Sequence, residues 1–353
     1  MNKHVEFDKN GFDILRYAAA LSVMFLHYSS YMMILSENLS VRGAAVMDGI
    51  RRWALLFPGV VILFAMSGFL ISASFERVGS RKEFFFRRVL RMYPELWICT
   101  IVNLAVVCIV VPKLLDKGVI FWVLTQIVGI ANTPECLRTF GTGSINGALW
   151  TVFTEIQLYI VLGIVYSYLK KMKTGCWAVF LAILVVANVA CGILTQNLDG
   201  IMPKLIERVF LPYALWFFIG VFCYQKRRKI LPVLRNASLP MVIAYLVIKS
   251  FPVELPGYYA DIATGILLPF AVIGGGYCLP RIRLKPDLSY GMFLYHWIVL
   301  NLMVHYDLIN KLQWPLGVML YVSGTVIAAA VSCKLGRALQ KLFLNFFKKI
   351  LAS

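Results

Sequence analysis

Residues 12–34 read FDILRYAAALSVMFLHYSSYMMI, and this stretch decides the kind of fold that the chain adopts. It is almost entirely apolar, with Asp13, Arg16 and His27 as its acidic and basic side chains. A helix rises about 1.5 Å per residue, so a helix of this length crosses a hydrocarbon core about 30 Å thick. We expect a retained first membrane span here, because no small-residue cleavage site of a signal peptide follows the run.

Nine further apolar runs follow along the chain. They lie at about residues 53–75, 95–112, 147–168, 176–194, 205–224, 239–251, 259–279, 288–306 and 316–336. Another run, at residues 119–131, is shorter than the roughly 20 residues of a span, so we expect an interfacial or re-entrant segment there. The pattern predicts an all-α, polytopic membrane protein with about ten transmembrane helices. We expect one transmembrane domain over residues 1–353, without an appended soluble domain.

Composition and charge agree with a membrane protein. Hydrophobic residues make up 60% of the 353 residues and charged residues only 15%, which excludes an ordinary soluble enzyme. The 35 Lys and Arg residues outnumber the 17 Asp and Glu residues, a net charge of +18. With ten spans and both termini in the cytoplasm, most of this positive charge falls in cytoplasmic loops, as the positive-inside rule requires. The charge therefore indicates contact with membrane lipids and not a nucleic-acid partner.

Two basic segments are interrupted by aromatic residues. Residues 81–97 read RKEFFFRRVLRMYPELW, so we expect residues 76–94 to form an amphipathic cytoplasmic segment that anchors to lipid headgroups or binds an anionic ligand. The second segment, KLFLNFFKK at residues 341–349, is interpreted as a headgroup anchor. The eight cysteines form no C-x-x-C pair, so neither a disulfide framework nor a metal site is indicated.

Polar side chains inside the predicted spans need a partner or a function, because burying them in lipid is costly. Arg16 and His27 are eleven residues apart, about three helical turns, and therefore share one helix face. Arg16 could simply pair with Asp13, and His27 could be a structural hydrogen-bonding group. Glu155, in the run at 147–168, could be a structural lock or a catalytic group whose partner is a His or Arg on another span.

Two other apolar runs carry small or polar residues at suggestive positions. Ser289 and His296 are seven residues apart and share a face, which suits interhelical hydrogen bonding. Ser67 and Gly68 form a small-residue notch in FAMSGFL at residues 64–70, for which close helix packing is the expected use.

Five segments together resemble the acyltransferase-3 family of integral membrane acyltransferases, which modify cell-surface carbohydrates. They are FDILRYAAALSVMFLHY with its R-x10-H spacing, FAMSGFL, RRVLRMYPELW with an R-x-x-R pair, ALWTVFTEIQLY and LSYGMFLYHW, in the family's order and over nearly the whole chain. The resemblance implies ten transmembrane helices in the bacterial inner membrane. It also implies acetyl-CoA as the cytoplasmic acyl donor, an acceptor hydroxyl on a surface or lipid-linked glycan, and no permanently bound cofactor.

The family's functional residues carry over to His27, Arg16, Arg88, Arg91 and Glu155. A sugar hydroxyl is a poor nucleophile while protonated, so His27 suits the role of general base, with Glu155 as a group that could fix its tautomer. The CoA phosphates would bind to cytoplasmic arginines, helped by Arg16. The donor-binding set is therefore Arg87, Arg88, Arg91 and Arg16, and possible supporting residues are Ser67, Ser289, Tyr290 and His296.

The chief alternative is a carrier or flippase in which the same polar residues line a translocation path. Such proteins often show paired repeats, which this sequence lacks. Other polytopic O-acyltransferases, acting on lipids, sterols or proteins, share the chemistry but not the motif order. The sequence does not indicate the acceptor glycan, the exact acyl group or the oligomeric state.

Overall fold

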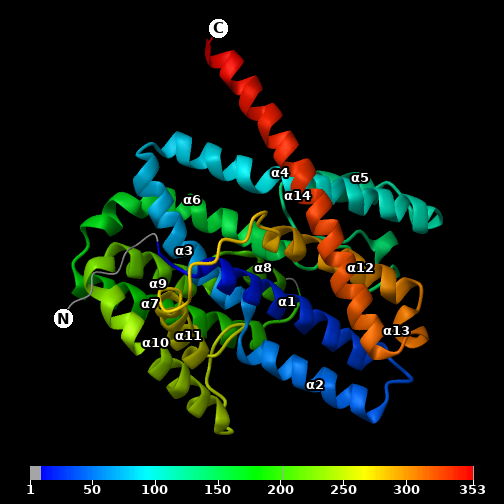
Figure 1. The fold of residues 1–353 in the computed structure, drawn as a ribbon, viewed down its shortest axis with the longest axis horizontal. Helices are drawn as coiled ribbons and strands as arrows, with labels where there is room; N and C mark the ends of the chain where they lie inside the picture. The colour runs from blue at the N-terminus through cyan, green and yellow to red at the C-terminus, as the bar shows by residue number, and fades with distance from the viewer. Residues whose placement is uncertain (1–8, 201, 353) are drawn as a thin grey trace. The chain divides into compact units, whose positions relative to one another are not determined.

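The computed structural model describes residues 9–200 and 202–352, and every element within these residues is a helix (Figure 1). The longer helices are α1 (Phe12–Leu35), α2 (Val41–Leu56), α3 (Gly59–Val78), α4 (Arg81–Val110), α5 (Gly118–Ile127), α6 (Leu149–Lys171), α7 (Thr174–Asn197), α9 (Ala214–Gln225), α10 (Arg227–Ser250), α11 (Ile262–Gly275), α12 (Ser289–His305) and α14 (Trp314–Ala352). Short helices are α8 (Met202–Arg208), α13 (Leu308–Lys311) and the 3-10 turns η1 (Pro112–Leu114), η2 (Glu135–Leu137) and η3 (Leu211–Tyr213).

Each of the ten predicted spans contains helix, which confirms an all-α, polytopic membrane protein. Within the described residues, seven helical segments are long and apolar enough to cross a membrane, and the bent pair of α8 and α9 would make an eighth. Helices α11 and α12 have 14 and 17 residues, shorter than the roughly 20 residues of a full span. Helix α5 has 10 residues, in agreement with its exclusion from the predicted spans.

Helix boundaries differ from the predicted ones at several places: α10 begins earlier, at Arg227, α14 continues to Ala352, and the second and third predicted spans are divided differently. The run predicted at residues 53–75 is divided at Phe57 and Pro58, where α2 ends and α3 begins, because proline restricts the residue before it to extended conformations. Helix α2 itself was not predicted. The basic segment at residues 81–94 and the third span form one continuous helix of 30 residues, α4, with Pro94 in its interior.

The chain divides into two compact units, each described by itself. Unit 1 comprises Met1–Ala19, Leu56–Arg81 and Thr154–Arg283, and unit 2 comprises Ala20–Leu55, Lys82–Phe153 and Leu284–Ser353. Helix α1 is continuous through the boundary between Ala19 and Ala20.

Unit 1 is organised around the tight packing of α3 against α9. A Cβ atom added to Gly68 would lie 1.9 Å from the carbonyl oxygen of Phe217, and one added to Gly220 would lie 2.0 Å from that of Ala65. The two backbones can approach this closely only because both positions lack a side chain. The expected packing role of the Ser67 and Gly68 notch is therefore supported for Gly68.

Unit 2 has α12 packed against α14, the helix that turns from orange to red in Figure 1. A Cβ atom on Gly291 would lie 2.9 Å from that of Ala329, so a small-residue contact again brings two helices together. Helix α12 is buried along most of its length, including His296 and Asn301, which are fully buried.

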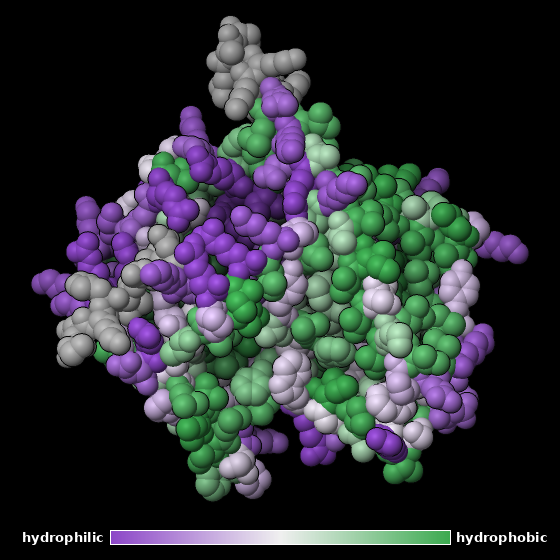
Figure 2. Space-filling model, viewed as in Figure 1, coloured by the Kyte–Doolittle hydropathy of each residue, from purple (hydrophilic) through white to green (hydrophobic). Residues whose placement is uncertain are grey.

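Large apolar side chains are exposed on both units, as the hydrophobic areas of Figure 2 show. On α7, Val179, Ile183 and Val186 are all more than half exposed and follow one another at helical spacing. A continuous apolar stripe that faces outward is expected where a helix contacts lipid chains.

Candidate active site

His27 lies in unit 2 and pairs with His296. The two imidazole rings stack with centroids 5.2 Å apart and an interplanar angle of 4°, and His27 Nδ1 is 3.0 Å from His296 Nε2. Trp297 packs its ring edge-on against His27 at 4.5 Å. The structure thus brings together the R-x10-H histidine of α1 and the late histidine of α12, two residues 269 positions apart.

The hydrogen-bond roles fix the tautomers of this pair when both rings are neutral. His296 Nδ1 lies 2.7 Å from the carbonyl oxygen of Phe293, which can only accept, so Nδ1 of His296 carries the proton. His296 Nε2 is then an acceptor, and the N–H of His27 Nδ1 donates to it. His27 consequently keeps its lone pair on Nε2, the nitrogen that a general base needs.

His27 is held in place from a third helix. The hydroxyl of Tyr321, on α14, donates to the carbonyl oxygen of Met24 at 3.0 Å, and its ring stacks on Tyr28 with centroids 4.7 Å apart. Both Tyr28 and Tyr321 are completely buried. Because Met24 and Tyr28 flank His27 on α1, these contacts set the position and rotation of the histidine relative to α14.

The other side of α12 holds a loop at residues 141–146. Asn301 Oδ1 accepts hydrogen bonds from Thr142 N at 2.9 Å and from Thr142 Oγ1 at 2.8 Å, and Asn301 Nδ2 donates to Ser144 O at 2.9 Å. Trp297 Nε1 donates to the same Ser144 oxygen at 2.9 Å. Loop and α12 are therefore one hydrogen-bonded body beside the histidine pair.

Sequence reasoning missed Trp297 and Asn301 as site residues. Trp297 directly follows His296 in the LSYGMFLYHW segment, and Asn301 lies one turn later in the same apolar run. A buried amide inside a membrane helix needs hydrogen-bond partners, and this rule was the signal available for Asn301.

Three of the four arginines of the predicted donor site lie on α4 and have different surroundings. Arg87 forms an ion pair with Glu83, one turn before it. The guanidinium of Arg88 lies over the ring of Phe84, 5.8 Å from its centroid. Arg91 is exposed and interacts electrostatically with Glu95, a residue that sequence reasoning did not single out.

Glu155 lies in unit 1, where two hydroxyl groups satisfy it. Ser67 Oγ on α3 donates to Glu155 Oε1 at 2.6 Å, and Tyr159 on α6 donates to the same oxygen. This arrangement matches the alternative of a structural lock between α3 and α6. The proposed pairing of Glu155 with His27 stays a prediction.

The remaining predicted residues have local partners. Arg16 is half-buried and pairs with Asp13 at 3.2 Å. Ser289 Oγ donates to Asp287 Oδ1 at 2.6 Å, at the start of α12. The hydroxyl of Tyr290 donates to the carbonyl oxygen of Met92 at 3.3 Å and so ties α12 to α4. Among the described residues, no group of three or more His, Cys, Asp and Glu side chains could hold a metal ion.

Comparison with known proteins identifies the class. The sequence model of the acyltransferase-3 family, described as an acyltransferase domain, matches residues 9–334. The chain is 29% identical to nodulation protein 10 of Rhizobium leguminosarum bv. viciae, over 94% of this chain and 93% of that protein. It is 24% identical to the O-acetyl transferase of Shigella phage Sf6, over 84% of this chain and 86% of that protein. No solved structure matches.

The protein is therefore a membrane-embedded acyltransferase. It belongs to the acyltransferase-3 family, as the five sequence segments indicated, and its activity is that of a membrane O-acyltransferase.

Proposed function

We propose that the protein transfers an acetyl group from cytoplasmic acetyl-CoA to a hydroxyl group of a surface or lipid-linked glycan, in a bacterial inner membrane. His27 acts as the general base. The observation that carries this proposal is the hydrogen-bond chain from His27 through His296 to the Phe293 carbonyl, which leaves the lone pair of His27 on Nε2. The similarity to an O-acetyl transferase supports acetyl as the transferred group.

The reaction transfers one acyl group and moves one proton. His27 Nε2 takes the proton of the acceptor hydroxyl as its oxygen attacks the thioester carbonyl carbon. The C–S bond then breaks, and the imidazolium returns the proton to the departing CoA sulfur. Direct transfer is favoured over an acyl-enzyme, because the partner of His27 is an imidazole and not a hydroxyl or thiol that it could activate.

His296 has the role of a positioning residue. It accepts the N–H of His27 Nδ1 and so holds the ring in the tautomer that the transfer needs, the task that an Asp performs in a hydrolase triad. The imidazolium formed during the reaction shares its charge along the chain toward the Phe293 carbonyl. Donor phosphates would bind to Arg88 and Arg91 on α4.

The test is label transfer from radiolabelled acetyl-CoA in inside-out vesicles, followed by extraction of the glycan and glycolipid fraction. We compare the wild type with His27→Ala and use His305→Ala as the matched control, because His305, at the end of α12, is an exposed histidine that packs on Phe140. Label should reach glycan with the wild type and His305→Ala and be lost with His27→Ala. Transfer at the wild-type rate by His27→Ala would exclude His27 as the base.

The same vesicles separate transfer from transport. A carrier or flippase neither binds CoA nor consumes a thioester. Unchanged acetyl-CoA in the presence of acceptor and folded wild-type protein would therefore contradict the proposed acetyl transfer.

A further inference from the structure

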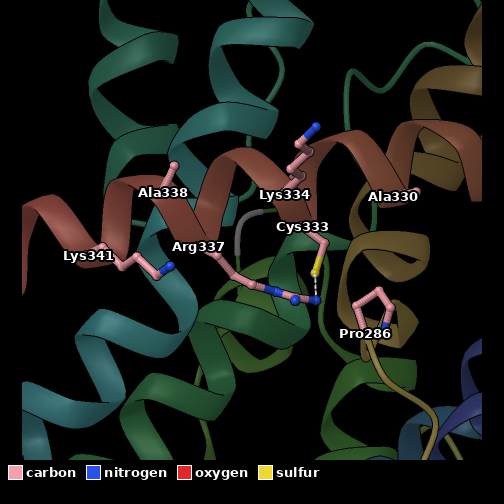
Figure 3. A pocket seen from close by; sticks show the side chains of 7 residues that line it. All are labelled: Pro286, Ala330, Cys333, Lys334, Arg337, Ala338 and Lys341. Atoms are coloured by element: carbon pink, nitrogen blue, oxygen red, sulfur yellow. Dashed lines mark hydrogen bonds between the residues drawn. The ribbon is translucent and has the colours of Figure 1, made fainter.

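A cavity in unit 2 carries positive charge that the proposed function has not used. Its volume is about 510 Å³, and it is lined by Pro286, Ala330, Cys333, Lys334, Arg337, Ala338 and Lys341 (Figure 3). The three cationic side chains lie on α14 at spacings of three and four residues, which places them along one helix face. The volume falls in the range of about 300–1,000 Å³ that is typical for small-molecule sites.

The guanidinium of Arg337 is turned toward the cavity wall formed by Cys333. Its Nη2 lies 3.0 Å from Cys333 Sγ, the contact that is drawn as a dashed line in Figure 3. Lys334 and Lys341 are exposed, so their ammonium groups are accessible to an entering anion. Arginine binds phosphate oxygens through two parallel hydrogen bonds, and lysine adds a mobile point charge.

Helix α4 brings the predicted donor-binding segment to the same place. A Cβ atom added to Gly336 would lie 2.6 Å from Glu95 Cγ, so α4 and α14 touch at this point. Glu95 interacts electrostatically with Arg337, Arg91 and Asp287. Together with Lys334 and Lys341 from the cavity lining, the cationic side chains named here outnumber the two carboxylates by four to two.

We infer that this cavity binds the phosphate groups of the acyl donor, and that Lys334, Arg337 and Lys341 form the site together with Arg91. The inference rests on the proposed function, which supplies a donor with a phosphorylated nucleoside. Pro286, Ala330 and Ala338 give the cavity an apolar wall suited to the nucleoside base. The segment at residues 341–349 was interpreted as a headgroup anchor, and Lys341 is here assigned to the donor instead.

Buried polar atoms continue from the cavity into unit 2. Tyr295 is 2% exposed and interacts electrostatically with both Glu95 and Cys99. Within the described part of the chain, no hydrogen bond satisfies Oδ1 of Asn103, while the buried hydroxyls of Tyr295 and Ser332 lie beside each other. Buried polar atoms without partners are costly, and the amide groups of a donor arm would satisfy them.

These atoms approach the histidine pair along α12. Asn103 Nδ2 lies 3.3 Å from Cys99 Sγ, and Asn146 Nδ2 donates to the carbonyl oxygen of Leu294 at 3.0 Å. Leu294 is two residues before His296 on α12. Polar side chains therefore follow one another from the region of the cavity to the α12 segment that carries His296.

The experiment measures CoA binding and acetyl-transfer kinetics of the full chain in nanodiscs that contain only phosphatidylcholine. Arg337→Gln and the double variant Lys334→Gln, Lys341→Gln test the site. Lys171→Gln is the control, because it removes an equally exposed cation from the end of α6. Arg337→Lys tests whether charge alone suffices, and thermal unfolding confirms that each variant is folded.

Both test variants should weaken CoA binding and raise KM for acetyl-CoA by about tenfold or more, with little change in kcat, while Lys171→Gln matches the wild type. The double lysine variant keeps the inference testable if Arg337→Gln fails to fold. Equal CoA binding by wild type and test variants would overturn the inference and leave the proposed function intact. An effect of the substitutions that appears only in nanodiscs with phosphatidylglycerol would assign the cavity to a lipid headgroup and overturn it as well. Absence of CoA binding by the wild type would contradict both proposals. CoA binding that depends on Arg337 but is not followed by acetyl transfer would contradict only the proposed function.

Discussion

Gly68 and Gly220 each allow the helix of the other to approach. The missing side chain of Gly68 makes room for the carbonyl of Phe217 on α9, and that of Gly220 makes room for the carbonyl of Ala65 on α3. The contact is reciprocal, so both glycines are needed to preserve it.

Replacing either glycine should therefore destabilise unit 1. Gly68→Ala and Gly220→Ala each place a methyl group within 2.0 Å of a backbone oxygen and force α3 and α9 apart, at a cost of about 1–3 kcal/mol. Thermal unfolding of the detergent-purified protein measures the loss. Gly175→Ala, where nothing lies within 4 Å of the added atom, is the matched control and should unfold with the wild type. Equal stability of all three variants would rule out the close approach.

His296 should affect turnover through the tautomer of His27. His296→Leu removes the acceptor of the His27 Nδ1 proton, and kcat should fall about 100-fold or more while KM for acetyl-CoA changes little. His296→Gln offers an amide oxygen as acceptor and should recover part of the loss. A role in packing alone would instead give Leu and Gln variants of similar activity, with thermal stability as the affected property.

Variants of Glu155 distinguish a structural role, in which the side chain links α3 to α6, from a catalytic role of the carboxylate. Glu155→Gln keeps an oxygen that accepts from Ser67 and Tyr159, so stability should be retained, whereas Glu155→Ala removes the oxygen to which both hydroxyls donate and should cost about 1–3 kcal/mol. Thermal unfolding and acetyl transfer are measured on the same preparations. Full stability with lost transfer in Glu155→Gln would show that the carboxylate charge is needed for chemistry.

Asn301 should control the order of the loop at residues 141–146. Asn301→Leu is similar in size but cannot bond Thr142 or Ser144, so the backbone amides of this loop should exchange hydrogen faster. Hydrogen exchange followed by mass spectrometry measures the effect, with the peptide containing α7 as an internal reference. Unchanged exchange in the loop would mean that its other contacts, through Trp297, Asn146 and Ile145, hold it without Asn301.

Much of the fold could be predicted because a membrane span requires a long apolar run, which a single sequence displays directly. The continuity of α4 could not, since the charged residues before Pro94 resemble a separate interfacial segment. Helix α2 was missed for a related reason: Arg42, Arg51 and Arg52 lower its hydropathy, and its ion pairs through Asp48 form only in the folded helix.

Single residues of the candidate site could be predicted from the sequence, but the contacts between them could not. The R-x10-H spacing pointed to His27, but it did not indicate the contact with His296, and the pairing of His27 with Glu155 stays a prediction. Glu155 accepts hydrogen bonds from Ser67, on the neighbouring helix α3, and from Tyr159, one turn later on α6. Such choices depend on which helix faces are brought together, and periodicity along one chain carries no information about neighbours in space.

Helix α14 sets the distance between two parts of unit 2. Tyr321 anchors the α1 helix beside His27, and Arg337, sixteen residues later on the same helix, lies at the cavity. At about 1.5 Å per residue, the helix sets roughly 24 Å between these two positions along its axis. One residue inserted between them would rotate the cations by about 100° away from the cavity. Seven inserted residues would nearly restore their direction and would increase the distance along the helix axis by about 10 Å. In the inferred donor site, the pitch of α14 would thereby set how far the donor phosphates lie from the α1 segment that carries His27.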